Sequence, residues 1–491
     1  MPAEQLKELK LSVRTGNEAA EIFIIDSQFQ RVATSIGQKA EFKLQPGLYS
    51  VKVRVGSEYE EKSVALLTKN ELVNFGPIQF STAAPLSGTA QTHDTQIDNA
   101  VAQSIQVHEY LGEGSQVYIF ARNWTEKDAP PTNYPLQQHP ARGLTLRNSA
   151  DEILVDFGSP GVGAYTSGTD PWSACNVQLD PGVYCLCLVT NSGQMIRQSV
   201  VASPDWQTQV FLLQGNYNAR ENDIHADLSN GSIFMSRIGH GFQSSKPYKH
   251  SKDPDFHLTE MARQALINNR PALGQELLSR MLKQKFTNPM LGIYAAHLLL
   301  LDDKADKSIL PAVIKKLRDL LTNPHPDIEA IAQKIKLPGN YIFSMPPMLH
   351  ISWNYVLEAS VTQPGIVPEN SVASTIAGEA WSGSPWLLWG HSASGADNTG
   401  ILSGLLKKLT KLELSAVDTS NLAPDELMAT KMELPVTENL GLQPASPSGE
   451  AVAPKGNILP EMDDEQMLHL VLALGIPRLK LEALIKNIKV N

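Results

Sequence analysis

A six-residue pattern that occurs twice constrains the fold of this chain more than any other feature. Leu-x-Pro-Gly-x-Tyr spans residues 44–49 and returns 135 residues later, at residues 179–184. Pro presets its own φ and Gly accepts a positive φ, so the pair predicts a tight turn. From Tyr49 to Val55, apolar residues then alternate with polar ones, which is the period of a half-buried β-strand. The repeat predicts two copies of one antiparallel β-unit.

The segments that flank the two turns also correspond. Glu21–Ile25 matches Gln116–Phe120, and Lys62–Ala65 matches Gln198–Val201. Short alternating runs separated by turn signals are typical of a β-sandwich. We therefore predict a first β-sandwich module over residues 1–80.

Changes in composition predict the other domain boundaries. Residues 81–98 are rich in Ser, Thr, Ala, Pro and Gly, which indicates a linker. A second sandwich, with insertions, is expected over residues 99–238. Apolar stripes at helical spacing, several of them opened by Pro, predict a helical domain over residues 255–412. The expected fold class is multi-domain: two antiparallel β-sandwich modules, an all-α bundle and a small C-terminal helical hairpin.

The C-terminal part is expected to recruit a partner. Residues 413–460 are rich in Pro, Ala, Ser, Glu and Thr, which predicts a flexible tether. Residues 461–491 predict two helices around Gly475 and Pro477, because Gly suits a helix end and Pro a first turn. An apolar face of this hairpin is predicted to bind a protein partner. Its residues are Met467, Leu470, Val471, Leu474, Leu481, Leu484 and Ile485.

Charge and cysteine content narrow the function classes. The formal net charge is -10 and Lys or Arg residues cluster in pairs at most, as at Lys315–Lys316, so no nucleic-acid partner is expected. Three cysteines do not make a disulfide framework, which favours a reducing compartment and a cytoplasmic location. No apolar run reaches the ~18 residues of a membrane span, so no membrane partner is expected.

The residues with chemical potential favour plain structural roles. Cys185 and Cys187 lie two apart on a predicted strand, but no second pair of metal ligands accompanies them. Cys175 lies in no nucleophile turn. His297 interrupts a strongly apolar helix, which is typical of a core histidine. We therefore predict no catalytic residue, no metal site and no cofactor.

A cluster of tryptophans leaves two interpretations open. Four of the seven tryptophans of the chain fall within 37 residues: Trp353, Trp381, Trp386 and Trp389. A core role is favoured over an exposed docking surface. His350, close to Trp353, keeps open a pocket in the helical domain.

The Leu44–Val51 segment with its flanking strands resembles the PEGA-type and carboxypeptidase-regulatory-like β-sandwiches, which are small accessory modules common in bacterial proteins. The second copy departs from the pattern, since Leu186 stands where the first copy has Val51. The resemblance implies binding or spacing rather than catalysis.

The leading hypothesis is a non-enzymatic scaffold or adaptor that mediates protein–protein interaction in a bacterial multi-protein system of the immune or stress type. Its partners would contact the C-terminal hairpin and the sandwich surfaces. One alternative is a hydrolase with a site near His350 and Trp353. The other is a carbohydrate-binding protein whose sandwich face exposes aromatic residues such as Tyr118 and Trp124.

Overall fold

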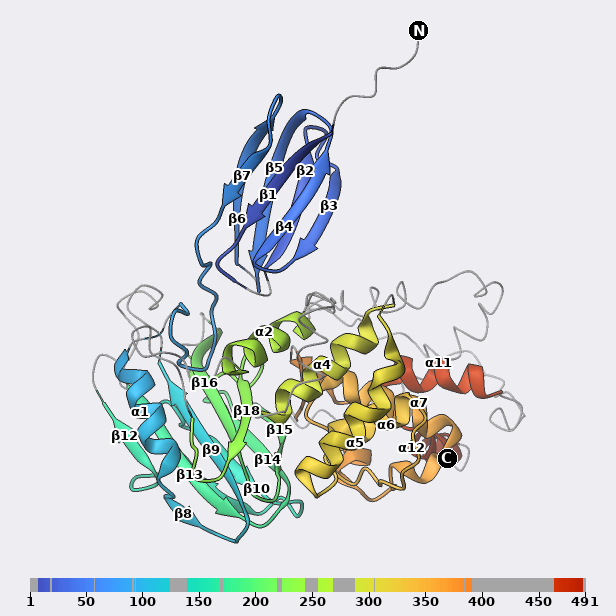
Figure 1. Cartoon of the computed structure of the whole chain (residues 1–491). Helices are drawn as coiled ribbons and strands as arrows, with labels where there is room; N and C mark the ends of the chain where they lie inside the picture. The colour runs from blue at the N-terminus through green and yellow to red at the C-terminus, as the bar shows by residue number, and fades with distance from the viewer. Residues whose placement is uncertain are drawn as a thin grey trace, which may run out of the picture. The chain divides into compact units, whose positions relative to one another are not determined.

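The computed structural model has several β-sheets in the N-terminal half and helices in the C-terminal half (Figure 1). It describes residues 8–17, 20–56, 58–90, 92, 94–123, 139–167, 171–218, 223–242, 255–267, 288–303, 305–383, 385–390 and 463–488. Residues 268–287 and 391–412 of the predicted helical domain, the predicted tether at 413–460, and Trp124 lie outside these residues.

Residues 9–74 form a sandwich of two sheets. The strands are β1 (Leu9–Arg14), β2 (Glu21–Asp26), β3 (Arg31–Ile36), β4 (Lys39–Leu44), β5 (Gly47–Val55), β6 (Glu58–Leu66) and β7 (Glu71–Asn74). One sheet has the order β4-β1-β7 and the other β3-β2-β5-β6. The alternation predicted for β5 is confirmed, because Val51, Val53 and Val55 are buried in the core between the sheets.

A second, larger sandwich follows. Its strands are β8 (Glu109–Tyr110), β9 (Ser115–Arg122), β10 (Leu144–Arg147), β11 (Ile153–Asp156), β12 (Ala164–Thr166), β13 (Trp172–Leu179), β14 (Gly182–Val189), β15 (Met195–Ala202), β16 (Trp206–Asn218), β17 (Asp223–Ala226) and β18 (Ser232–Arg237). One sheet runs β12-β13-β9-β16-β17, with β18 also on β16 and β8 on β13. The other begins β11-β10-β14-β15.

Strand pairing shows that the two sandwiches share one topology. In the first, β1 lies antiparallel to β4 and parallel to β7, while β5 lies between β2 and β6. In the second, β9 lies antiparallel to β13 and parallel to β16, while β14 lies between β10 and β15. The predicted duplication is thus present in the strand order, with the two motif strands β5 and β14 in equivalent places.

One of the predicted correspondences is wrong. Glu21–Ile25 lies on β2, whose topological counterpart is β10, whereas Gln116–Phe120 lies on β9, the counterpart of β1. The match of Lys62–Ala65 with Gln198–Val201 is confirmed, since β6 and β15 both pair with the motif strand. Short alternating apolar strands resemble one another whatever their place in a sheet, so their sequence similarity does not fix the correspondence.

The tyrosine of the repeated motif makes the same contact in both sandwiches. The Tyr49 hydroxyl donates to the Gln45 carbonyl oxygen at 2.7 Å, and the Tyr184 hydroxyl donates to the Asp180 carbonyl oxygen at 2.8 Å. Each bond spans the Pro-Gly turn and ties it to the strand that follows. The motif therefore repeats because it closes the same corner twice.

Removal of either hydroxyl is expected to weaken its own sandwich. Tyr184→Phe or Tyr49→Phe deletes one hydrogen bond, which typically lowers the free energy of unfolding by about 1 kcal/mol. Urea unfolding followed by circular dichroism measures this change. Tyr59→Phe is the control, since the Tyr59 side chain is exposed; an equal loss in that variant would contradict the role of the corner.

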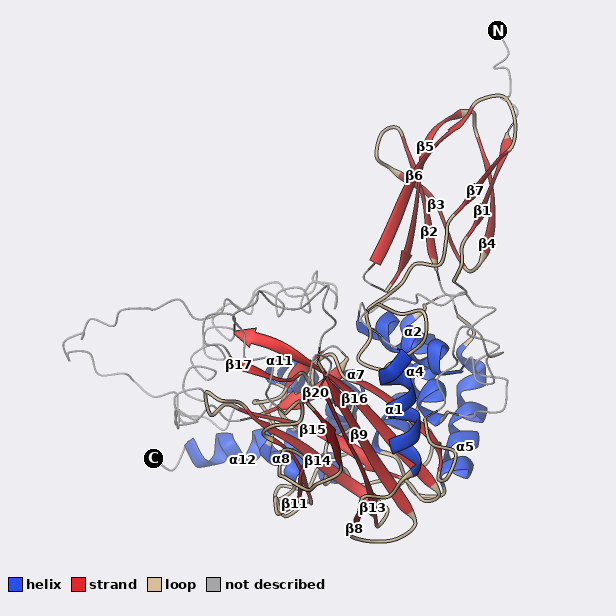
Figure 2. Cartoon of the chain, turned by 90° about the vertical axis from the view of Figure 1, so that its left-hand side faces the viewer, coloured by secondary structure: helices blue, strands red, loops and turns tan. Residues whose placement is uncertain are grey.

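The segment expected to be a linker is part of the second sandwich. Thr82, Ala83 and Leu86 are buried, and helix α1 (Asp94–Ile105) begins inside the predicted linker and lies against β13 (Figure 2). The fully buried Arg122 side chain donates to the carbonyl oxygens of Thr82 and Ala83 at 2.8 and 2.9 Å. Small and polar residues indicate a linker by composition, but here their size lets the backbone approach a buried guanidinium.

The helical region is not all-α. Its helices are α2 (Asp255–Ile267), α4 (Pro289–Leu301), α5 (Leu310–Leu321), α6 (Pro326–Lys334), α7 (His350–Thr362) and the short α8 (Val372–Thr375). Residues after α8 form a hairpin of β19 (Trp381–Gly383) and β20 (Trp386–Trp389), where the sequence predicted an all-α bundle. β20 pairs with β15 and so completes a sheet of the second sandwich. One apolar core is shared by this sandwich and helices α2 and α4 to α6.

Two helices end the described chain, α11 (Asp464–Leu474) and α12 (Arg478–Ile488). Helix α12 contacts α7: the Arg478 guanidinium donates to the Val361 carbonyl oxygen at 2.6 Å, and its backbone N–H donates to Ser360 Oγ at 3.2 Å. No described helix is both long and apolar enough to cross a membrane.

Candidate functional site

The tryptophan cluster is mostly core. Trp353, Trp386 and Trp389 are buried, and Trp386 Nε1 donates to the Gly231 carbonyl oxygen at 2.8 Å. Trp381 is 37% exposed. The predicted preference for core is confirmed for Trp353, Trp386 and Trp389, and Trp386 belongs to the core shared with the second sandwich.

A buried polar cluster includes Ser352, which lies between His350 and Trp353 on α7. Ser352 Oγ of α7 is 3.0 Å from His297 Nε2 of α4, and Ser352 also hydrogen-bonds Asp327 of α6. The Asp327 carboxylate accepts the N–H groups of Met348 and Leu349 at 3.0 and 2.9 Å. Leu349, at the N-cap of α7, has no side chain that can cap the helix, so Asp327 does so from a neighbouring helix.

Burial sets the protonation of this cluster. It raises the pKa of Asp327 to about 6, although the hydrogen bonds from Ser352, Leu349 and Met348 act in the opposite direction. Burial also lowers the pKa of His297 and of His325, the N-cap residue of α6, to about 3. Near neutral pH the carboxylate is charged and both imidazoles are neutral.

The cluster has the residue types of a catalytic triad but not its geometry. In a hydrolase the acid orients the histidine, and the histidine activates an accessible serine. Here Asp327 binds Ser352 itself, and His297, Ser352 and Asp327 are all fully buried. The arrangement fixes three helices together, and the hydroxyl has no surface at which a substrate would meet it.

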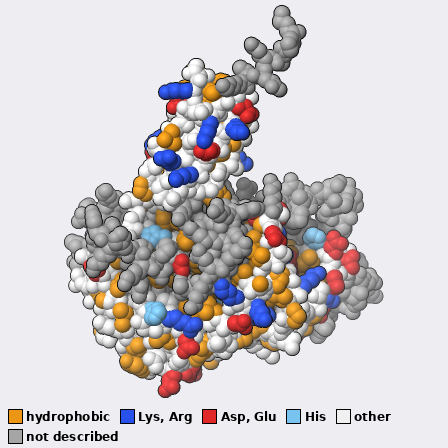
Figure 3. Space-filling model, in the orientation of Figure 1, with side chains coloured by type: hydrophobic (Ala, Val, Ile, Leu, Met, Phe, Trp, Pro, Cys, Tyr) orange, Lys and Arg blue, Asp and Glu red, His pale blue; other side chains and the backbone are white. Residues whose placement is uncertain are grey.

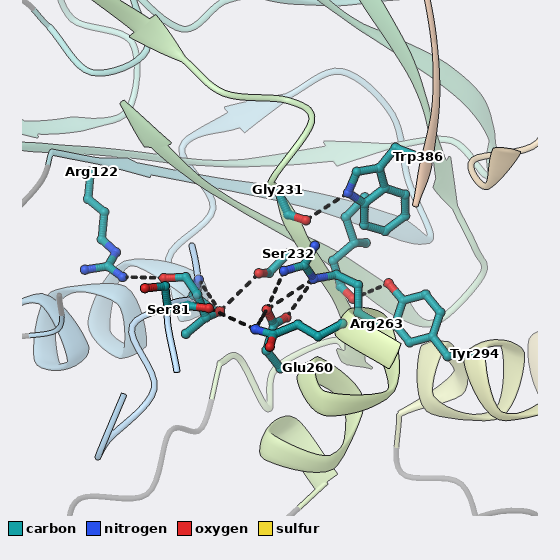
Figure 4. Close-up of polar contacts among 12 residues, drawn as sticks. Ser81, Arg122, Gly231, Ser232, Glu260, Arg263, Tyr294 and Trp386 are labelled. Atoms are coloured by element: carbon teal, nitrogen blue, oxygen red, sulfur yellow. Dashed lines mark hydrogen bonds and ion pairs between the residues drawn. The ribbon is translucent and has the colours of Figure 1, made fainter. Parts of the chain in front are cut away.

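A second buried polar group joins helix α2 to the second sandwich (Figure 4). Arg263 and Glu260 form a two-pronged ion pair, with Nε to Oε2 at 3.0 Å and Nη2 to Oε1 at 2.6 Å. Burial favours a neutral Arg263, but the Glu260 carboxylate outweighs it and raises the pKa of Arg263 above its ordinary value. Gln264 Nε2 extends the network to the Ser81 carbonyl oxygen at 2.8 Å.

The three cysteines are free and buried. Cys175 lies in the shared core, and Cys185 and Cys187 lie on the opposite face of β14 from Leu186 and Leu188, which point into that core. Burial raises the pKa of Cys175 and of Cys185 to about 12. In the part of the chain that the structure describes, no group of His, Cys, Asp or Glu side chains is arranged to hold a metal ion.

Alkylation of the native protein is therefore expected to be slow. A thiol with a pKa near 12 has a thiolate fraction at pH 8 that is about 1000-fold below that of an ordinary cysteine. Iodoacetamide treatment followed by mass spectrometry should leave Cys175 and Cys185 unmodified in the folded protein and modify them in urea. Rapid modification of the folded protein would contradict the burial.

Of the two aromatic residues named for a carbohydrate-binding face, Trp124 lies outside the described residues. Tyr118 is fully buried. On the outer face of the first sandwich, Lys52 Nζ lies 3.7 Å from the centre of the Tyr59 ring, and Arg54 lies 5.2 Å from the centre of the Phe23 ring. Each of these two rings therefore has a cation over one face.

One end of the first sandwich exposes apolar side chains on two turns and at the start of β5. Phe29 is 90% exposed, Leu48 61% and Leu67 56%. We call these three residues the apolar tip. Phe29 has a positive φ of 59°, a left-handed conformation that costs a residue with a Cβ roughly 1–2 kcal/mol. Such strain is retained where the surroundings impose it, which is frequent at functional positions.

The predicted partner-binding residues of the C-terminal hairpin divide into two groups. Met467, Val471 and Leu481 are buried in the folded chain. Leu470, Leu474 and Leu484 are half-buried. The Ile485 side chain lies outside the described residues.

Neither the buried cluster nor the apolar tip was found from the sequence. His297, Asp327 and Ser352 are distant in the chain, and no spacing rule joins three helices. For Phe29 a signal was present: Asp26-Ser-Gln-Phe-Gln lies between two alternating strands, where a large apolar residue is unusual for a turn.

Comparisons with known proteins give no family. No family model and no curated protein sequence matches the chain. Among solved structures, the Bacillus anthracis TIE protein is 12% identical with a TM-score of 0.15 over 49% of this chain and 32% of that one. A putative cell adhesion protein from Bacteroides eggerthii is 8% identical with a TM-score of 0.13 over 49% of this chain and 98% of that one. The chain spans about a third of the length of the first, and scores this low carry no argument.

Proposed function

We propose that this protein is a non-enzymatic adaptor that binds a protein partner through its first β-sandwich. The observation that carries the proposal is where the exposed large apolar side chains lie. Of the fourteen found among the described residues, six lie within residues 9–74: Phe29, Val32, Leu48, Tyr59, Leu67 and Leu72. Residues 94–237 also carry six, but over about twice the length of chain, so the exposed apolar side chains are denser on the first sandwich. Exposed apolar side chains gathered on one module are typical of an interaction surface.

The two sandwiches differ in how much of their surface is covered. In the second, the outer face of β9 is buried. Its Tyr118 and Phe120 belong to one buried apolar cluster, together with Ala84, Phe242 and Phe256. In the first, the outer face of the counterpart strand β1 carries Lys10, Ser12 and Arg14, of which the first two are half-buried and the last is exposed. The same topology thus supports a structural role in one copy and a binding role in the other.

The rest of the chain is proposed to serve as the body of the adaptor, and residues 461–491 as a second contact. Since Val471 and Leu481 are buried, the C-terminal hairpin would have to leave α7 before it offered its apolar face. The system is proposed to be bacterial and cytoplasmic, of the immune or stress type, and the sandwiches to be of the PEGA-like accessory type.

Cross-linking in the native host tests the proposal. The tagged full-length protein is cross-linked in cells with a lysine-reactive reagent, purified, and the linked peptides are identified by mass spectrometry. We expect links from a stoichiometric partner to concentrate on Lys43, Lys52 and Lys69. A partner linked instead to residues 461–491, or a protein that purifies alone, would overturn the proposal.

A further inference from the structure

The apolar tip has the features of an anchor for protein recognition. We infer that Phe29, Leu48 and Leu67 insert into an apolar pocket on the partner protein, with Phe29 as the central contact. This inference rests on the proposed function and narrows it to one end of the first sandwich.

Strand register places the three side chains at the same end. Asp26, the last residue of β2, pairs with Tyr49 near the start of β5, and Gly47 pairs with Leu66, the last residue of β6. The β2–β3 turn with Phe29, the start of β5 with Leu48, and the β6–β7 turn with Leu67 therefore lie together. The three exposed side chains therefore project from the same end of the sandwich, where a partner can contact all of them.

The turn that carries Phe29 is held rigid. The Asp26 carboxylate accepts the N–H groups of Gln28 and Gln30, both at 2.9 Å, and the Phe29 N–H donates to the Asp26 carbonyl oxygen at 3.0 Å. These bonds impose the left-handed backbone that turns the ring into solvent. A rigid aromatic side chain loses little conformational entropy on binding, which is the property of an anchor residue.

The charges near the apolar tip favour a protein over a lipid surface. Lys10 pairs with Glu41 at 2.6 Å, and Lys69 pairs with Glu71 at 3.6 Å. Figure 3 likewise shows basic and acidic side chains interspersed over the visible face of this sandwich. Anionic membranes attract clusters of unpaired Lys and Arg, whereas an apolar centre with a mixed polar rim is typical of a protein interface.

Site-specific photo-cross-linking tests the location. p-Benzoylphenylalanine replaces Phe29 in the full-length protein in its native host, and in a matched strain it replaces Tyr59, an exposed aromatic residue on the sheet face. We expect position 29 to give one protein adduct whose linked residues are apolar, and position 59 to give little. An adduct at position 59 alone would overturn the inference and leave the proposed function standing. Lipid adducts, or none at either position, would overturn both.

The affinity of the identified and purified partner then gives the magnitude. Phe29→Asn in the full-length protein is expected to weaken binding by about 30-fold, as for a hot-spot residue. Asn tolerates a left-handed backbone, so the fold should keep its thermal midpoint while the ring is lost. Tyr110→Ser, which changes an exposed aromatic residue of the second sandwich, should change the affinity less than twofold. A Phe29→Asn protein that binds as tightly as the original would overturn the inference.

Discussion

Replacement of Glu260 by Ala is expected to lower the free energy of unfolding by about 3–5 kcal/mol. The substitution leaves the Arg263 guanidinium buried without the carboxylate that it contacts through Nε and Nη2. A buried charge without its partner bears the full cost of desolvation. Urea unfolding at pH 7.5, followed by tryptophan fluorescence, measures the change.

The double variant Glu260→Met/Arg263→Met is the matched control. Both charges are then removed together, and flexible apolar side chains of similar length fill the space. We expect it to recover most of the stability lost in Glu260→Ala, since apolar replacements of buried ion pairs are often neutral. If both variants lose the same stability, the network contributes through its shape and its bond to Ser81 rather than through charge.

Acidification is expected to destabilise the protein between about pH 6 and pH 4. His297 and His325 have a pKa near 3 in the folded chain but about 6.5 when unfolded, so the unfolded chain binds two more protons in this range. Asp327 acts oppositely, because its folded pKa of about 6 lets the folded chain bind one. The unfolded chain therefore binds a net excess of one proton. The free energy of unfolding should fall by about 1.4 kcal/mol for each unit by which the pH is lowered. Urea unfolding across this range measures the slope.

His297→Gln isolates the cause of this slope. The Gln amide can still hydrogen-bond Ser352, but it does not titrate. The remaining effects of His325 and Asp327 then oppose each other, and the contribution of the cluster to the slope should fall close to zero. An unchanged slope in the variant would assign the acid sensitivity to other groups.

Many strands and helices could be predicted from the sequence, but the way in which they pack together could not. The β5 strand, the duplication and the helices that open at Pro289 and Pro326 followed from local rules, because turn chemistry and helix starts depend on neighbouring residues. The place of Trp381–Trp389 did not, since joining a sheet depends on a strand far away in the chain. The linker prediction failed for the same reason: Arg122, distant in sequence, determines the environment of Thr82 and Ala83.

Candidate sites were harder to predict than elements. His297 was expected to be a satisfied core histidine, and its contact with Ser352 agrees, but nothing in the sequence indicated that Asp327 would cap α7 from another helix. The partner-binding face of the C-terminal hairpin was inferred from its helical spacing. Helices that pack within the folded chain need the same apolar spacing. The spacing of Val471 and Leu481 therefore does not distinguish partner binding from internal packing, and both side chains are buried.

The late strand β20 has a consequence for how the chain folds. Its pairing of Trp389 with Arg197 joins residues 192 positions apart, so the sheet cannot close until the ribosome has released nearly four-fifths of the sequence. Contacts between residues so far apart in the sequence slow folding, because the entropy of closing a long loop is lost before the strand pairing stabilises the chain. Until then the exposed edge of β15 is open to wrong pairing, and nascent chains are expected to depend on chaperones. The first sandwich, whose strand pairs all fall within residues 9–74, can fold as soon as it emerges.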